Sequence, residues 1–155
     1  ERAPGMQLSG IDLSPHMLSR ARHNIEKKGL SEKISLKPGS AESIPYPENS
    51  FDIVVSTASI HHWKNPDACL NEIHRVLKRG GRALLYDLVS DTPREKVAEM
   101  KRRFGRLMTL MLFIHSFEEP FYTYEAFASL PEATLFKEGD VKWVGILCSL
   151  ALKKE

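Results

Sequence analysis

The strongest constraint on the fold is a short β run that leads directly into a capped helix. Residues 7–13 read QLSGIDL, and residues 14–29 continue as SPHMLSRARHNIEKKG. Ser14 suits the helix N-cap and Pro15 the first helical position, where its missing N–H costs no hydrogen bond. Apolar residues then recur at helical spacing, and Gly29 suits the left-handed end of the helix. This pattern predicts a strand followed by a helix.

The same alternation continues along the chain. The further expected elements are strands at 33–37, 51–56 and 83–89, helices from Asn65-Pro66 to Gly80-Gly81, from Thr92-Pro93 onward and over 123–130, and closing strands near 134–137 and 145–153. The continuous apolar run Ile53-Val54-Val55 is typical of a parallel strand that is covered on both faces. We therefore expect one α/β domain over residues 1–155.

Composition narrows the class of protein further. The chain is 42% hydrophobic and 27% charged, with 22 Lys and Arg against 20 Asp and Glu, which excludes disorder by composition and a dominant basic field for DNA. Cys69 and Cys148 form no disulfide framework and no zinc-ligand spacing, so we expect no metal and interpret them as core residues in a reducing compartment. The apolar stretch 107–114 is too short to span a bilayer.

Polar residues follow the first three expected strands. They are Asp12, then Ser40-Ala41-Glu42, then Ser56-Thr57. In an open parallel sheet, ligands bind outside the carboxyl ends of the strands, and an acidic residue there can accept hydrogen bonds from two ribose hydroxyls. Two interpretations of Asp12 stay open, because the same side chain can instead help to cap the following helix.

Three stretches together resemble one family. GIDLSPHMLSRARHN, GSAESIPYPENSFDIVV and LNEIHRVLKRGGRALLYD are similar to the class I S-adenosylmethionine-dependent methyltransferases, in particular the small-molecule branch that includes the ubiquinone/menaquinone C-methyltransferases. The resemblance runs from about Met6 to Val89 in the right order. It implies a Rossmann-like, mostly parallel sheet with flanking helices and an antiparallel C-terminal strand.

The resemblance also implies a role for each matching cofactor residue. Asp12 would hold the ribose hydroxyls of S-adenosylmethionine, and Leu13 would pack near the adenosine. Ala41 would offer its backbone N–H to the adenine, beside Ser40, which is shorter than the family's usual Asp or Asn. The remaining cofactor candidates are Glu42 and Thr57. Two interpretations of Glu42 stay open, compensation for the short Ser40 or a solvated loop charge, and Thr57 would lie near the methionine portion.

The amino end departs from the family pattern. The family's first strand and its glycine-rich loop should precede Asp12 by about twenty residues, but only eleven residues lie there and Glu1-Arg2-Ala3-Pro4-Gly5 is not a G-x-G-x-G. The missing strand would lie at the centre of the sheet, between the Gln7–Leu13 and Phe51–Ser56 strands. We expect the chain to lack this strand because it is a fragment, with a segment supplied by another chain as the alternative.

Substrate residues are harder to assign. His61 and His62 follow the third strand, where an imidazole can orient an acceptor or take its proton. His115, which interrupts an apolar helix end, is a further candidate to face the substrate. No catalytic residue is assigned, because methyl transfer depends mostly on placing the nucleophile. The region 93–130 is expected to be a helical lid with apolar lining or an oligomerisation segment, with Lys101-Arg102-Arg103 and Arg106 on its solvated face.

The sequence thus predicts a cytoplasmic methyltransferase that acts on a small molecule, with S-adenosylmethionine as its cofactor. We expect no nucleic-acid partner and no membrane span. We also expect self-association through the apolar end of the long helix and through the incomplete sheet. Two alternatives stay open: a non-catalytic binding or assembly protein with the methyltransferase fold, and a nicotinamide-dependent oxidoreductase, since Asp12 alone fits that class as well. A nucleic-acid methyltransferase is a weaker alternative, because the third strand ends in Ser56-Thr57-Ala58 rather than an N-P-P-Y-type motif.

Overall fold

The structure is a computed structural model that describes residues 5–118 and 121–155, with the side chains of residues 108 and 112–118 outside that description. The chain divides into two compact units, Glu1–Tyr46 and Pro47–Glu155.

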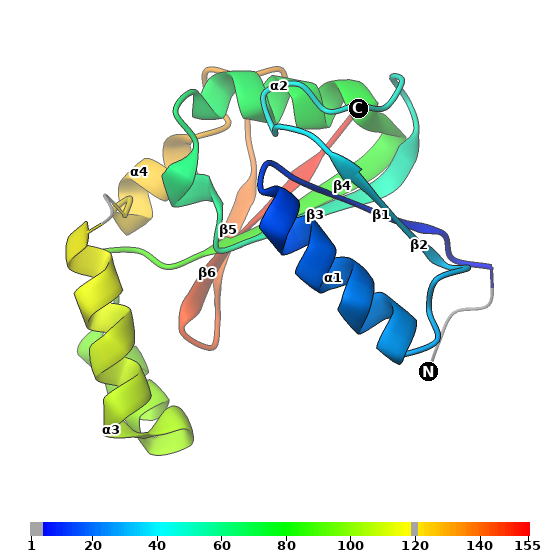
Figure 1. Ribbon diagram of the computed structural model, residues 1–155. Helices are drawn as coiled ribbons and strands as arrows, with labels where there is room; N and C mark the ends of the chain where they lie inside the picture. Colours follow the sequence, from blue (N-terminus) through cyan, green and yellow to red (C-terminus); the bar gives the residue numbers. More distant parts are fainter. Residues whose placement is uncertain (1–4, 119–120) are drawn as a thin grey trace. The chain divides into compact units, whose positions relative to one another are not determined.

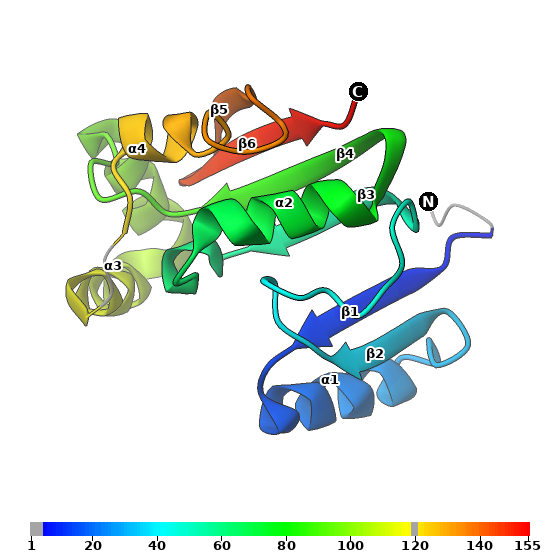
Figure 2. The same cartoon turned by 90° about the horizontal axis from the view of Figure 1, so that it is seen from above.

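The first unit is a parallel strand pair with one helix. β1 (Leu8–Asp12) and β2 (Ile34–Pro38) pair in parallel, and α1 (Pro15–Lys27) connects them and packs beside them (Figures 1 and 2). The Ser14 hydroxyl accepts the Met17 N–H at 3.3 Å, so the expected N-cap is formed. The predicted strand–helix unit is confirmed in this order and with these boundaries to within two residues.

The second unit contains a mixed sheet of four strands. Its order is β3-β4-β6-β5, with β3 (Phe51–Thr57) parallel to β4 (Leu77–Asp87), and with β6 (Leu147–Lys153) antiparallel to both β4 and β5 (Asp140–Val144). The short turn η1 (Ile60–His62) follows β3, and α2 (Pro66–Val76) then runs along the β3–β4 side of the sheet (Figure 2). The helices α3 (Arg94–Glu118) and α4 (Tyr124–Ser129) connect β4 to β5.

Two strands each keep an edge without a β partner. Among the described residues β1 pairs only with β2, and β3 pairs only with β4. These are the two strands that the resemblance places beside the family's first strand. The predicted fold class, α/β with parallel strands and antiparallel pairing at the C-terminal end, is confirmed, and the absence of the first strand stays a prediction.

Gly80-Gly81 was expected to end a helix, and this expectation is wrong. α2 ends at Val76, where the Arg75 and Val76 carbonyls accept the backbone N–H groups of Asn49 and Ser50. The two glycines lie inside β4, where the register passes from Phe51↔Leu77 to Ile53↔Arg82 and leaves a bulge. A Cβ on Gly81 would lie 2.8 Å from the Lys78 carbonyl oxygen, so this position needs glycine for the close approach.

The closing strands also differ from the prediction. Residues 134–137 lie in turns and not in a strand, and β5 begins at Asp140. Thr134 is instead buried, and its hydroxyl donates to the Pro131 carbonyl at 2.8 Å and accepts the Phe136 N–H at 3.2 Å. A threonine hydroxyl that satisfies nearby backbone groups in this way favours a turn over a strand.

The core of the second unit lies between α2 and the sheet. Its fully buried side chains include Leu70 on α2, Leu85 on β4 and Leu150 on β6. Both cysteines are buried as predicted, Cys69 at 1% and Cys148 at 0% exposure. Burial and the charge of Asp91 raise the pKa of the Cys148 thiol to about 11, so this thiol is protonated at neutral pH.

α3 consists of two helical stretches. Gly105 has φ +82° and ψ 163° and interrupts the helix, and Figure 1 shows the chain turning at the lower end of α3. The predicted roles of 93–130 as a lid or an oligomerisation segment, and the single domain over 1–155, stay predictions. The side chain of His115 lies outside the described residues.

Candidate functional site

Asp12 is at the carboxyl end of β1, half-buried. Its Oδ1 accepts the Ser14 N–H at 2.8 Å, which fixes the entry into α1. Its Oδ2 makes no hydrogen bond to the part of the chain that the structure describes. The carboxylate therefore has a local structural role and retains an oxygen that can accept from a ligand. Leu13 beside it is 75% exposed.

The structure places Ser40-Ala41-Glu42 at the same edge of the first unit as Asp12. β1 and β2 are parallel with Asp12 opposite Pro38, and the Gly39 N–H donates to the Asp12 carbonyl at 3.2 Å. The Ser40 hydroxyl accepts the Glu42 N–H at 3.1 Å, which closes a tight turn. The Ala41 N–H finds no acceptor within the described residues, and Glu42 is exposed. This edge thus presents a carboxylate oxygen and a backbone donor.

In the second unit, β3 ends at Thr57, which is exposed and pairs with Tyr86 of β4. The next residue, Ala58, has φ +51°, a left-handed conformation that is unfavourable for a residue with a Cβ. Its N–H donates to the Tyr86 carbonyl at 2.8 Å, and the hydroxyls of Ser56 and Ser59 are 2.6 Å apart. This strained turn directs the chain into η1, and strain of this kind is concentrated at functional sites.

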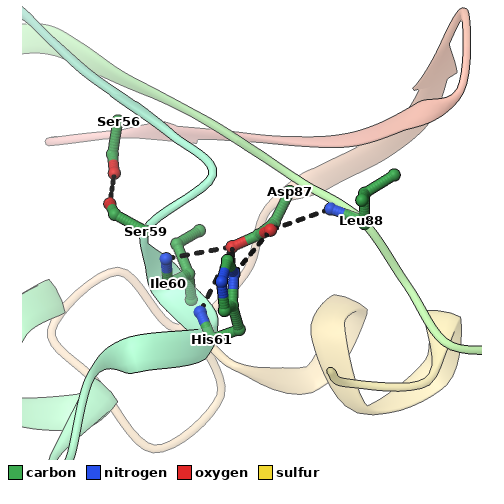
Figure 3. A network of polar contacts seen from close by, with 6 residues as sticks. All are labelled: Ser56, Ser59, Ile60, His61, Asp87 and Leu88. Carbon is green, nitrogen blue, oxygen red and sulfur yellow. Dashed lines mark hydrogen bonds and ion pairs between the residues drawn. The ribbon is translucent and has the colours of Figure 1, made fainter. Parts of the chain in front are cut away.

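His61 is held by a buried carboxylate at the end of β4 (Figure 3). The His61 Nδ1 is 2.9 Å from Asp87 Oδ1 and 3.0 Å from Oδ2, and the two side chains are 3% and 1% exposed. Asp87 Oδ2 also accepts the N–H groups of Ile60 and His61, and Oδ1 accepts that of Leu88. A carboxylate at Nδ1 favours the tautomer that carries its proton on that nitrogen, with the lone pair on Nε2.

Aromatic rings surround the imidazole of His61. The ring of Phe121 lies 4.3 Å away between centroids, and that of His62 lies 3.9 Å away. His62 itself is exposed, so the two predicted substrate residues occupy different environments.

Tyr122 adds a further ionisable group to this region. Burial raises the pKa of its phenol, and the charges of Asp67, Asp87 and Cys69 raise it further. Its backbone carbonyl accepts the Ser90 N–H at 2.9 Å and so connects the segment after β4 to the segment before α4. Sequence reasoning missed Asp87, Phe121 and Tyr122 as members of this region.

The remaining histidines divide into two kinds. His16 and His23 are exposed on α1. His74 on α2 is half-buried, and its ring packs edge-on against that of Phe136 at 5.0 Å between centroids. Burial and the charge of Lys154 lower the pKa of His74. In the described residues, no three His, Cys, Asp or Glu side chains gather in a way that could hold a metal ion.

Comparison with known proteins identifies the family. The family described as "Methyltransferase domain" matches residues 1–85. The chain therefore belongs to the methyltransferase domain family, and its similarities place it among the class I S-adenosylmethionine-dependent methyltransferases.

Curated relatives match about half of this chain. Uncharacterized protein YafE of Escherichia coli is 44% identical over 79 residues, which cover 51% of this chain and 38% of the relative. The 2-methyl-6-phytyl-1,4-hydroquinone methyltransferase 1 of Oryza sativa is 40% identical over 82 residues (53% and 24%). The demethylmenaquinone methyltransferase of Bacteroides fragilis is 36% identical over 84 residues (54% and 34%). The matched segment thus spans less than two thirds of each of these relatives.

A solved structure supports the fold over nearly the whole chain. A SAM-dependent methyltransferase from Aquifex aeolicus has a TM-score of 0.70 at 18% identity and covers 94% of this chain and 68% of that one. At this identity the likeness shows the fold alone. The Rossmann-like class expected from the resemblance is confirmed.

Proposed function

We propose that this chain takes part in transferring a methyl group from S-adenosylmethionine to a small-molecule acceptor. The observation that carries the proposal is the edge formed by Asp12 and Ser40-Ala41-Glu42, in a chain that belongs to the methyltransferase family. A carboxylate oxygen for ribose hydroxyls and a backbone N–H for an adenine nitrogen are the groups that an adenosine ligand requires. We assign the adenosine end of the cofactor to these residues and to Leu13. The role of Thr57, in the second unit, near the methionine portion stays a prediction from the sequence.

We assign the acceptor to the region of His61 and His62. Methylation of a hydroxyl, an amine or an activated carbon releases a proton from the acceptor. With its proton held on Nδ1 by Asp87, the His61 imidazole has the tautomer that can accept a proton at Nε2. Hydroquinones are the first acceptors to test, because the name of one relative contains that class and another is named for menaquinone. We place the reaction in the cytoplasm.

The first test is calorimetric titration of S-adenosylhomocysteine into this chain. We expect saturable binding that Asp12→Ala weakens roughly tenfold or more, the usual effect of losing a hydrogen bond to a charged group. Glu32→Ala removes an exposed carboxylate elsewhere in the first unit and serves as the matched control. Equal affinity in the wild type and Asp12→Ala would contradict the assignment of Asp12.

The same instrument separates the two alternatives. Titration with NADH should show no binding, whereas saturable binding of NADH in place of S-adenosylhomocysteine would favour an oxidoreductase. Binding of S-adenosylhomocysteine without transfer of a labelled methyl group to any hydroquinone or other small molecule tested would favour the non-catalytic binding protein.

A further inference from the structure

The turn of α3 exposes an unusual surface, which we call the α3 tip and define as residues 101–111. Four of its side chains are cationic, Lys101, Arg102, Arg103 and Arg106, and all four are exposed. No acidic residue lies between Glu99 and Glu118 in the sequence. The charged side chains of the α3 tip are therefore all positive, although the formal net charge of the whole chain is only +2.

Large apolar side chains are exposed on the same tip. Phe104 is 52% exposed and Leu107 is 73% exposed, on either side of the turn at Gly105. Leu110 and Met111 follow Leu107 at helical spacings of three and four residues, so they share its face, and they are 56% and 60% exposed. A helix at the surface of a water-soluble protein usually packs such an apolar face against the core.

The inward side of α3 is already occupied. Met100 is 6% exposed and Thr109 is 1% exposed, and the Thr109 hydroxyl donates to the Gly105 carbonyl at 2.9 Å. This bond ties the second stretch to the turn. Among the described residues, α3 therefore packs through Met100 and Thr109. The apolar face of Leu107, Leu110 and Met111 points away from that packed side.

We propose that the α3 tip binds the surface of an anionic lipid membrane. Cationic side chains beside exposed aromatic and aliphatic ones are the composition of a segment that lies in a membrane interface, where the cations meet lipid phosphates and the apolar groups enter the acyl boundary. No helix in the described part of the chain is long and apolar enough to cross a bilayer.

Other occupants fit these charges less well. Two copies that met through this tip would bring two sets of four cations together, which like-charge repulsion disfavours. An RNA would neutralise the cations but would leave the face of Leu107, Leu110 and Met111 in water. An anionic lipid surface satisfies both features at once.

The test is flotation of the full chain with vesicles of phosphatidylcholine, alone or mixed with phosphatidylglycerol. We expect binding to the anionic vesicles only, and loss of that binding at high salt. The triple variant Lys101→Gln, Arg102→Gln, Arg103→Gln should lower the partition coefficient roughly 100-fold, from about fivefold for each cation. The control triple Arg22→Gln, Lys27→Gln, Lys28→Gln removes three exposed cations from the first unit and should bind like the wild type.

A second pair of variants tests the apolar part. Phe104→Ser with Leu107→Ser should weaken binding by roughly tenfold or more. Leu135→Ser, which changes a leucine that is 57% exposed outside the tip, is its control and should have no effect. Circular dichroism of each variant shows that a loss of binding does not come from unfolding.

A probe places the contact directly. Phe104→Cys offers the one accessible thiol in the described residues for an environment-sensitive dye, since Cys69 and Cys148 are 1% and 0% exposed. The dye should shift to shorter wavelength with anionic vesicles and not with neutral ones, whereas a dye at Leu135→Cys should not shift. The proposal would be overturned by equal binding to neutral vesicles, by no binding, by a dimer that Leu107→Ser dissociates, or by binding of a homopolymer RNA without binding of vesicles.

Discussion

Asp12 and Asp87 both end parallel strands, but they use their carboxylates in opposite ways. Asp12 is half-buried, accepts one backbone N–H through Oδ1, and keeps an Oδ2 that has no hydrogen bond to the described residues. Asp87 is 1% exposed and accepts three backbone N–H groups and the His61 imidazole. The difference indicates that the strand end alone does not define a ligand-binding carboxylate, because one of the two is already fully engaged within the protein.

The largest expected effect is on stability. Asp87→Ala leaves a buried imidazole and three backbone donors without their acceptor, and we expect it to lower the free energy of unfolding by about 3–5 kcal/mol. Asp12→Ala should cost below about 1 kcal/mol, since it loses one partly solvated bond. Urea denaturation of both variants measures this difference in the free energy of unfolding. Equal losses in the two variants would contradict the contrast between Asp12 and Asp87.

The next effect separates the two partners of the buried pair. His61→Phe keeps a ring and leaves the Asp87 carboxylate with its backbone donors, so we expect a loss of about 1–2 kcal/mol, smaller than that of Asp87→Ala. His62→Phe changes the exposed neighbour and serves as the control. If His61→Phe proved as damaging as Asp87→Ala, the backbone bonds of the carboxylate would contribute little.

A smaller effect on stability compares the turn that follows β1 with the turn that follows β3. Ser14 after β1 has φ −86°, whereas Ala58 after β3 has φ +51°. Ala58→Gly relieves this strain and should raise the free energy of unfolding by about 0.5 kcal/mol, after the larger chain entropy of glycine in the unfolded state is subtracted. Ser14→Gly has no such strain to relieve and should not stabilise. A destabilised Ala58→Gly would show that the left-handed turn carries no strain.

The smallest effect is a pH dependence that reports on the charge of Asp87. Asp87 contributes to the raised pKa of Tyr122, so Asp87→Asn should lower that pKa, and Asp12→Asn should leave it unchanged. Because the folded pKa lies above the unfolded one, Tyr122 stabilises the fold fully below the unfolded value, near 10, and this stability is lost as the pH rises through the folded value. Ultraviolet difference titration, with Tyr122→Phe to assign the signal, measures the shift.

Local signals predicted the first unit well. The Ser14-Pro15 start of α1 and the position of Asp12 after β1 depend on neighbouring residues, and the structure has both. The same reasoning failed at Gly80-Gly81, because α2 is ended by backbone partners from Asn49 and Ser50, which no local pattern announces. The pairing of β4 with β3, which is tertiary structure, decides that the two glycines lie in a strand and not at a helix end.

The candidate site shows the same division. Asp12 and Ser40-Ala41-Glu42 follow their strands directly, so the order of the chain places them at one edge. His61 was found from its position after a strand, but its partner Asp87 lies twenty-six residues further on, and only the pairing of β3 with β4 brings the two together. A carboxylate at the end of the neighbouring parallel strand was the signal that could have identified it.

The sheet order also bears on how the chain folds during synthesis. β6 lies between β4 and β5, although both are made before it. β5 therefore has no strand to pair with until residues 147–153 have left the ribosome, and the edges of β4 and β5 that β6 will pair with stay open until then. Lys154 then joins the C-terminal end of β6 to the carbonyls of Arg75 and Leu77, at 3.4 and 2.8 Å. The sheet of the second unit is thus completed only by β6, which is synthesised after the other strands that it joins.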